Sequence, residues 1–252
     1  MSRPADRIGE RAPWQRHPLT QFLAVLLGVG PMYLLSILGG TGEAAARDFR
    51  PPTVFGSLLL VVIVVVLFGG VLVLLLNAVC GEPLRALNLR RSTLRQDLAD
   101  GAGLCLYIIA AMLLYGLFLG WTGMEQVPAA NRKIADALAA NLQLLPIWFG
   151  PVVWLQAALY EEFSRVFLLS RLWQIWPGLA VRVAVVLVSA TLFGLGHIYQ
   201  GATGALGTAV IGMILGLHYM ARGRVLPLII AHGIYDTLVL ATLVIGTVNG
   251  LF

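Results

Sequence analysis

Residues 58–76 read LLLVVIVVVLFGGVLVLLL, a run that contains no polar side chain. The run is apolar on every face of a helix, whereas a strand that crosses a bilayer alternates in polarity over about 10 residues. About 20 apolar residues are enough for a helix to cross the hydrocarbon core. The run therefore predicts a membrane-spanning helix and gives no indication of a barrel.

The composition extends this prediction to the whole chain of 252 residues, of which 59% are apolar and 12% charged. Soluble domains have about 45–50% apolar and about 25% charged residues. Further apolar segments recur along the chain, and all are expected to be helical: about 19–39, 54–79, 103–122, 144–176, 181–200, 203–220 and 225–246. The sequence predicts an all-α, polytopic transmembrane bundle of about seven spans, with too few remaining residues for a soluble domain.

The positive charges predict how the chain is oriented in the membrane. We divide the chain into a basic tail (1–18), N-terminal helices and connections (19–142) and a catalytic core (143–252), all in one integral membrane domain. Twelve of the 17 Lys and Arg residues lie in the tail and in connections on the same side, and four lie on the other side. The positive-inside rule predicts a cytoplasmic N-terminus. The net charge of +5 therefore reflects topology, and no nucleic-acid partner is expected.

Ionisable side chains inside the last spans are the candidates for function. From residue 143 onward the side-chain carboxylates are Glu161, Glu162 and Asp236, and all three fall inside apolar segments, as do His197 and His232. An ionisable group at the bilayer centre costs about 2.5–3.5 kcal/mol on the insertion scale. Such groups need partners and indicate a functional site.

Helical spacing suggests these partners. Three pairs are four positions apart and share a helix face: Glu161 with Arg165, Phe193 with His197, and His232 with Asp236. A hairpin that turns at Pro177–Gly178 would place Glu161 and His197 at one membrane level, roughly 24–28 Å from the turn. His232 lies only ~12 Å from the Arg222–Arg224 connection. The hairpin must therefore project further into the cytoplasm, or the helices must tilt.

Three motifs, in this order, resemble the CAAX protease and bacteriocin-processing family, the glutamic-type intramembrane proteases. The family shows Glu-Glu-x-x-x-Arg, then Phe-x-x-x-His, then His-x-x-x-Asn or Asp on three membrane helices. Here the motifs are Glu161-Glu162-Phe163-Ser164-Arg165, Phe193-Gly194-Leu195-Gly196-His197 and His232-Gly233-Ile234-Tyr235-Asp236. The likeness covers about residues 150–240. It implies an intramembrane endopeptidase in a cell membrane, with a bacterial cytoplasmic membrane the expected location.

The first motif departs from the family pattern because its arginine comes one position early. If the glutamate pair is the anchor, Glu161 is the first family carboxylate. If Arg165 is the anchor, Glu161 is the second and Tyr160 takes the first position. Glu161 fills a carboxylate position either way, and which glutamate acts as the base stays open.

The resemblance implies catalytic roles for Glu161, Glu162, His197, His232 and Asp236, with Arg165 and Phe193 as structural support. A glutamate would take a proton from a water held with His197, and His232 would donate to the oxyanion or the leaving amine. Asp236, where the family often has Asn, would orient His232 or donate while protonated. No cofactor is expected, and the expected partners are membrane lipids and a peptide or protein substrate. The mouth of the site is expected to face the cytoplasm.

A zinc-dependent variant of the same site is one alternative. Zinc could be held by Glu162, His197, His232 and Asp236, with a position left open for water. This would make the protein a metalloendopeptidase, although the sequence contains no His-Glu-x-x-His pairing.

A second alternative is a non-catalytic membrane scaffold or regulatory binding protein. Buried polar networks can specify packing without catalysis. A structural role would need only one ion pair, whereas five ionisable groups on three helices are expected to converge here.

Overall fold

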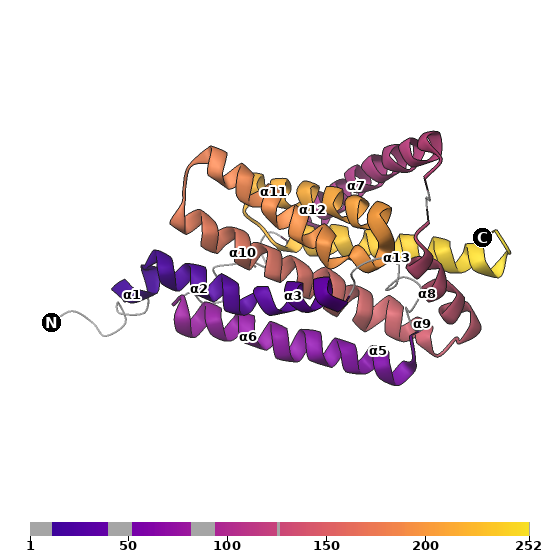
Figure 1. The fold of residues 1–252 in the computed structure, drawn as a ribbon, viewed down its shortest axis with the longest axis horizontal. Coiled ribbons are helices and arrows are strands. Elements are labelled where there is room, and N and C mark those ends of the chain that lie inside the picture. Colours follow the sequence, from indigo (N-terminus) through magenta and orange to yellow (C-terminus); the bar gives the residue numbers. More distant parts are fainter. Residues whose placement is uncertain (1–11, 40–51, 82–93, 125–126, 252) are drawn as a thin grey trace.

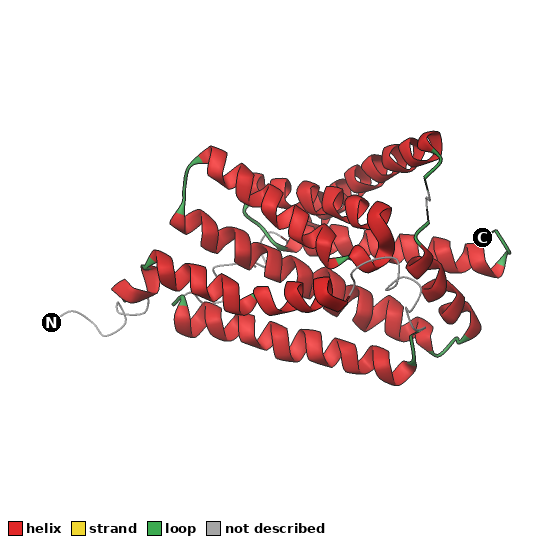
Figure 2. Cartoon of the chain, in the orientation of Figure 1, coloured by secondary structure: helices red, strands yellow, loops and turns green. Residues whose placement is uncertain are grey.

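The computed structural model describes residues 12–39, 52–81, 94–124 and 127–251. These ranges are almost entirely helical and contain no strand (Figure 2). The helices form an elongated bundle whose members run mostly along its long axis (Figure 1). This confirms the predicted all-α, polytopic bundle.

The first half of the chain contains α1 (Pro13–Arg16), α2 (Pro18–Gly28), α3 (Gly30–Gly39), α5 (Val54–Val61), η2 (Val62–Phe68), α6 (Gly69–Leu74), η3 (Leu75–Val79), α7 (Leu94–Thr122) and α8 (Ala129–Ala140). The second half contains α9 (Leu144–Ile147), η6 (Trp148–Glu161), α10 (Glu162–Ile175), α11 (Leu179–Gly196), η7 (Ile198–Gln200), α12 (Gly201–Arg222) and α13 (Leu226–Val248). Elements η2, η3 and η6 are π-helical, and η7 is a 3₁₀ turn.

In the described part of the chain, six helical segments are long and apolar enough to cross a membrane: Pro18–Leu35, Val54–Val79, Leu94–Thr122, Leu179–Gly196, Ile198–Arg222 and Leu226–Val248. They correspond to six of the expected spans. The remaining one, 144–176, is helical from α9 through η6 to α10 and carries the paired glutamates. The count of seven spans and the cytoplasmic N-terminus stay predictions.

Polar contacts define one end of the bundle, which we call the arginine end. Three contacts join helix ends there: Gln15 Nε2 to Ala78 O (3.3 Å), Arg171 Nη1 to Gln21 Oε1 (3.1 Å) and the ion pair of Arg224 with Asp97. They bring together the starts of α2 and α7, the end of η3, and the ends of α10 and α12. The α10–α11 and α12–α13 connections lie at this end.

Other contacts define the opposite end of the bundle. Trp148 Nε1 donates to Ser57 Oγ at 3.0 Å and joins η6 to the start of α5. Thr247 Oγ1 donates to Asp136 Oδ1 at 3.3 Å and joins the end of α13 to α8. The short connection between α11 and α12 lies at this end too, next to α8.

The two connections at the arginine end lie at different depths. The α10–α11 connection projects beyond the α12–α13 connection (Figure 1). Helix α11 has 18 residues before it reaches His197, a length of about 27 Å. His232 follows the start of α13 by only about 9 Å. The projection of the hairpin therefore lets His197 and His232 contribute to one site, as the sequence required.

Close packing of α12 against α11 and α10 fixes the helices around the site. A Cβ added to Gly212 would lie 3.0 Å from both Arg165 Nη1 and Phe193 Cδ1. One turn further, a Cβ on Gly216 would lie 2.9 Å from Val186 Cγ1. Small residues allow helix backbones to approach closely in lipid. Gly212 therefore leaves the space that the Arg165 and Phe193 side chains occupy.

Candidate active site

Arg165 and Glu162 form a buried ion pair at the centre of the site. Arg165 Nε donates to Glu162 Oε2 at 2.9 Å, and Nη2 donates to Oε1 at 3.2 Å. Both side chains are 0% exposed. The spacing of four predicted a pair with Glu161, and this is wrong: the partner is Glu162, three positions from Arg165.

Arg165 also joins α10 to its two neighbouring helices. Its Nη1 donates to the carbonyl oxygen of Gly212 in α12 at 3.3 Å, and its guanidinium carbon lies 4.1 Å from the centroid of the Phe193 ring in α11. A buried charge is tolerated when it is paired and its donors are satisfied. The arginine is thus a fixed part of the framework and does not line the cavity described below.

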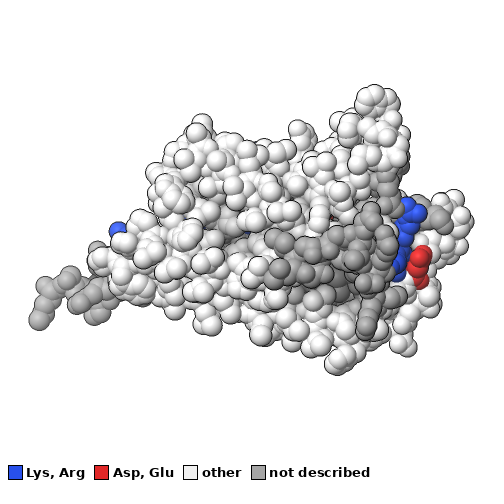
Figure 3. All heavy atoms as spheres, viewed as in Figure 1, with Lys and Arg blue, Asp and Glu red and all other residues white. Residues whose placement is uncertain are grey.

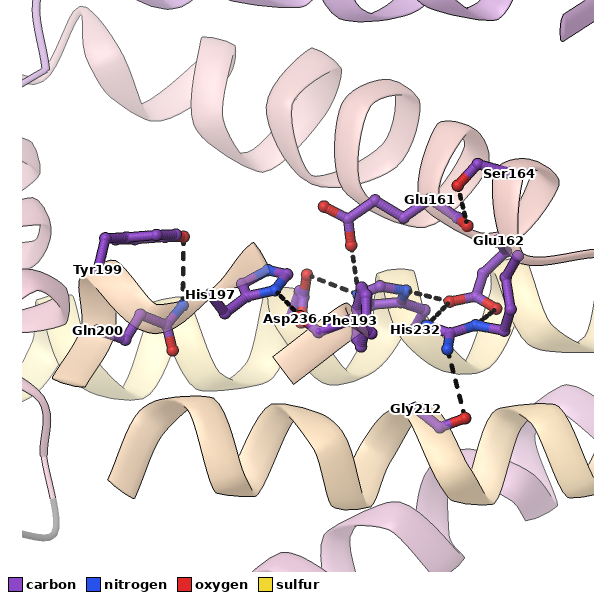
Figure 4. Close-up of polar contacts among 11 residues, drawn as sticks. Glu161, Glu162, Ser164, Phe193, His197, Tyr199, Gln200, Gly212, His232 and Asp236 are labelled. Carbon is purple, nitrogen blue, oxygen red and sulfur yellow. Dashed lines mark hydrogen bonds and ion pairs between the residues drawn. The ribbon is translucent and has the colours of Figure 1, made fainter. Parts of the chain in front are cut away.

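His232 lies between carboxylates on both sides of its ring (Figure 4). Its Nδ1 is 2.9 Å from Glu162 Oε1. Because both oxygens of Glu162 already accept from Arg165, Nδ1 of His232 is the donor in this contact. Its Nε2 lies 3.3 Å from Asp236 Oδ2 and 3.9 Å from Glu161 Oε2.

Glu161 and Glu162 are adjacent but face different surroundings. Glu161 lines the cavity, whereas Glu162 does not. Glu161 Oε2 is buried and has no hydrogen-bond partner among the described residues. The π-helix η6, with its wider i→i+5 turn, ends at Glu161, and the α-helix begins at Glu162. Adjacent residues on a helix point about 100° apart, so the two side chains diverge at this junction.

His197 is held at the end of α11 by its own backbone. Its Nδ1 lies 2.8 Å from the Phe193 carbonyl oxygen. A carbonyl oxygen can only accept, so Nδ1 donates and Nε2 of the neutral ring is left as an acceptor. The Phe193 ring lies 4.8 Å from the His197 ring and 6.1 Å from the His232 ring, measured between centroids. Phe193 therefore contacts both histidines as well as Arg165.

These side chains border a cavity of about 1040 Å³. Its lining includes the predicted residues Glu161, Phe193, His197, His232 and Asp236. The cavity continues toward the opposite end of the bundle, past the starts of α5, α8 and α12. Its described lining includes no residue of the α10–α11 or α12–α13 connection. The site was expected to open near the Arg222–Arg224 connection, and the cavity runs away from it.

The structure therefore brings together the predicted residues from the three predicted segments. Direct polar contacts join Glu162 to Arg165 and His232, and His232 to Asp236. Glu161 and His197 complete the group at the cavity wall. The catalytic roles of these side chains stay predictions.

Other polar residues of the cavity were missed in the sequence. Tyr199 lies beside His197, with ring centroids 5.8 Å apart, and its hydroxyl accepts from Gln200 Nε2 at 3.2 Å. Gln156 also lines the cavity, and its buried Oε1 has no hydrogen-bond partner among the described residues. The available signals were the polar residues directly after His197 and the single amide within the apolar run 144–160.

The residues suggested for zinc do not form a metal site in this arrangement. Both oxygens of Glu162 accept hydrogen bonds from Arg165, and Oε1 also accepts from His232. Zinc requires ligands that converge on one point at about 2.0–2.3 Å. Within the described ranges, no group of three His, Cys, Asp or Glu side chains is placed to hold a metal ion.

The bundle and its buried acid–histidine cluster are those of a multi-pass membrane protein. Residues 143–238 match the family model described as type II CAAX prenyl endopeptidase Rce1-like. This match includes all three motifs and confirms the resemblance to the CAAX protease and bacteriocin-processing family. At the family level it supports a CAAX-type endopeptidase with a peptide or protein substrate at the membrane. No curated protein and no solved structure matches the chain.

Proposed function

We propose that the protein is a glutamic-type intramembrane endopeptidase in which Glu161 is the general base. The supporting observation is the difference between the paired glutamates. Glu161 lines the cavity and its Oε2 has no hydrogen-bond partner among the described residues, whereas both oxygens of Glu162 accept from Arg165. A general base needs a free acceptor within reach of the water it deprotonates. Glu161 has such an acceptor, and Glu162 serves as a positioning residue.

In the first step, a water in the cavity attacks the carbonyl carbon of the scissile peptide bond. Glu161 takes one proton from this water, and His197 Nε2 accepts a hydrogen bond from its other hydrogen. The carbonyl π electrons move to the carbonyl oxygen, which becomes an oxyanion. Fixed donors in a site without bulk water stabilise such an oxyanion most strongly.

His232 supplies the donor for the oxyanion. Its Nδ1–H is held by Glu162, so a ring protonated at both nitrogens presents Nε2–H toward the cavity. Asp236 Oδ2, at 3.3 Å, orients this nitrogen before the substrate binds. In this role Asp236 is a positioning residue, one of the two roles suggested from the sequence.

In the second step the tetrahedral intermediate collapses. The proton on Glu161 passes to the leaving nitrogen, the C–N bond breaks, and the oxyanion electrons re-form the carbonyl. The products are a new carboxyl group and a new amine. Glu161 returns to the carboxylate form, so one water is consumed and no cofactor enters the reaction.

The same proposal assigns the enzyme to the cytoplasmic membrane of a bacterium, with lipids around it and without nucleic acid as a partner. Large apolar side chains face outward on the long helices, for example Phe55 (76% exposed), Leu117 (71%) and Trp121 (84%). On the face that Figure 3 shows, the charged atoms of the described residues lie near the two ends. Outward-facing apolar side chains of this kind fit a lipid environment.

A cleavage assay on membranes tests the proposal. Proteins that change in a deletion strain are compared among strains that express the wild type, the Glu161→Gln variant or the Glu162→Gln variant. Loss of the base lowers turnover by a factor of about 10²–10⁴. Wild-type cleavage by a folded Glu161→Gln variant would exclude Glu161 as the base. If none of these proteins yields a fragment that depends on Glu161, the scaffold alternative is favoured instead.

A further inference from the structure

We propose that the substrate reaches Glu161 from the non-cytoplasmic face of the membrane. The substrates would then be extracytoplasmic segments of membrane or exported polypeptides. This inference rests on the proposed function and adds to it the side of access and the substrate class. Four features of the chain carry it: the direction of the cavity, the position of His197, the packing behind the site and the distribution of positive charge.

The cavity extends from the site toward the opposite end of the bundle. Three helix starts contribute to its wall at that end: Thr53 and Gly56 near the start of α5, Pro128 and Asn131 near the start of α8, and Gln200 and Gly204 near the start of α12. Thr53 and Gly56 are exposed. The cavity therefore reaches the surface level of this end, where Trp148 contacts Ser57.

His197 lies in the connection at the opposite end. Helix α11 ends at Gly196, the 3₁₀ turn η7 spans Ile198–Gln200, and α12 begins at Gly201. The histidine is thus separated from α12 by a single turn of three residues. The connection contacts α8, and His197, Tyr199 and Gln200 line the cavity there. A peptide that enters the cavity from this end therefore meets His197 before it meets any other histidine of the site.

The other side of the site is closed by a packed apolar layer. Toward the arginine end, Leu169, Val186, Leu215 and Leu228 are each 0% exposed and belong to one hydrophobic cluster. Along α10, the fully buried Arg165–Glu162 pair lies between Glu161, which lines the cavity, and Leu169 of this layer. Protein interiors packed in this way leave few voids larger than a water molecule. A peptide has no route through the layer without separation of the helices.

The charge distribution assigns the two ends to the two sides of the membrane. Among the described residues, six basic side chains lie near the arginine end: Arg16, Arg95, Arg171, Arg182, Arg222 and Arg224. The described basic side chains near the opposite end are Arg132 and Lys133 in α8. The positive-inside rule places the arginine end in the cytoplasm. The cavity, which runs to the other end, then opens outside.

Cysteine labelling tests the side of access without reference to activity. The native Cys80 and Cys105 are buried, so they give little background with a membrane-impermeant maleimide. The Asn131→Cys variant probes the cavity wall. Leu142→Cys, where the native side chain is 72% exposed, reports the opposite end, and Arg222→Cys reports the arginine end. We expect intact cells to label the first two, and Arg222→Cys to react only after permeabilisation. The reverse pattern overturns the proposal.

Mapping of cleavage sites tests the substrate class. Fragments that appear with the wild type and disappear with the Glu161→Gln variant are assigned to segments on either side of the membrane. We expect their termini in extracytoplasmic segments, and Glu161-dependent cuts confined to cytoplasmic segments overturn the proposal. If intact cells label Asn131→Cys but no fragment depends on Glu161, the proposed proteolytic function is wrong, while the non-cytoplasmic opening of the cavity is supported. The two failures are therefore distinguishable.

Discussion

The central carbon of the Arg165 guanidinium lies 4.1 Å from the centroid of the Phe193 ring, within the range of a cation–π contact. The same ring touches the rings of both histidines. The Phe193 ring thus lies between Arg165 of the buried ion pair and the rings of His197 and His232. Any change at this ring is expected to move the histidines.

Phe193→Leu keeps an apolar side chain but removes the ring contacts. We expect turnover to fall by roughly tenfold, which corresponds to about 1.4 kcal/mol in the activation free energy. Cleavage rates and thermal unfolding in detergent would be measured together. Phe167→Leu is a matched control, because Phe167 is also buried in the core below an arginine, Arg171, at 6.0 Å. The control should lose stability without a comparable loss of turnover, and equal effects on turnover would contradict the role of Phe193.

The paired glutamates should differ in their effect on stability. Glu162→Gln leaves Arg165 as a buried charge without its partner, and such a loss costs about 3–5 kcal/mol. Glu161→Gln removes no hydrogen bond to a described residue, so the free energy of unfolding should change by less than about 0.5 kcal/mol. Thermal or denaturant unfolding of both variants checks this. Equal destabilisation would show that Glu161 also supports the fold.

Arg165→Lys tests the two-point contact with Glu162. A lysine ammonium keeps the charge but lacks the planar fork that donates from Nε and Nη2. We expect a stability loss of about 1–3 kcal/mol, together with reduced turnover because Glu162 no longer fixes His232. A lysine variant with wild-type stability and turnover would show that charge alone is sufficient at this position.

Gly212→Ala tests the close approach of α12. The added methyl group would lie 3.0 Å from Arg165 Nη1 and from Phe193 Cδ1. Overpacking of this kind costs about 1–3 kcal/mol, and here it should also lower turnover. Gly216→Ala is the control, since its methyl group would contact the Val186 side chain instead. Similar turnover in both variants would show that the space left by Gly212 is not specifically required for activity.

Metal removal should leave the activity unchanged. Because both Glu162 oxygens are held by Arg165, the acid–histidine cluster is expected to work without zinc. Elemental analysis of the purified protein and cleavage after treatment with chelators would be compared. One zinc per chain, with activity lost on chelation and restored by zinc, would require a different arrangement of these side chains.

Much of the fold and the composition of the site could be predicted from the sequence. The apolar segments predicted the helices because a helix in lipid needs apolar side chains on every face. The scarcity of carboxylates after residue 143 singled out Glu161, Glu162 and Asp236.

The roles of the two glutamates could not be separated from the sequence. A spacing of four suits an α-helix, and it suggested the pair of Glu161 with Arg165. The π-helix η6 ends at Glu161, so the side chains on either side of this point do not follow one regular period. The direction of the cavity could not be predicted from the sequence either, because it depends on how the starts of α5, α8 and α12 are packed in the fold.

Only the three residues Ile198–Gln200 separate His197 from the start of α12. An insertion between α11 and α12 would disturb the packing of this turn against α8, so variation there is costly. The starts of α5 and α8 border the cavity yet contribute none of the five residues assigned to the chemistry. New substrate preferences are therefore expected to evolve through those two helix starts, while the turn stays unchanged.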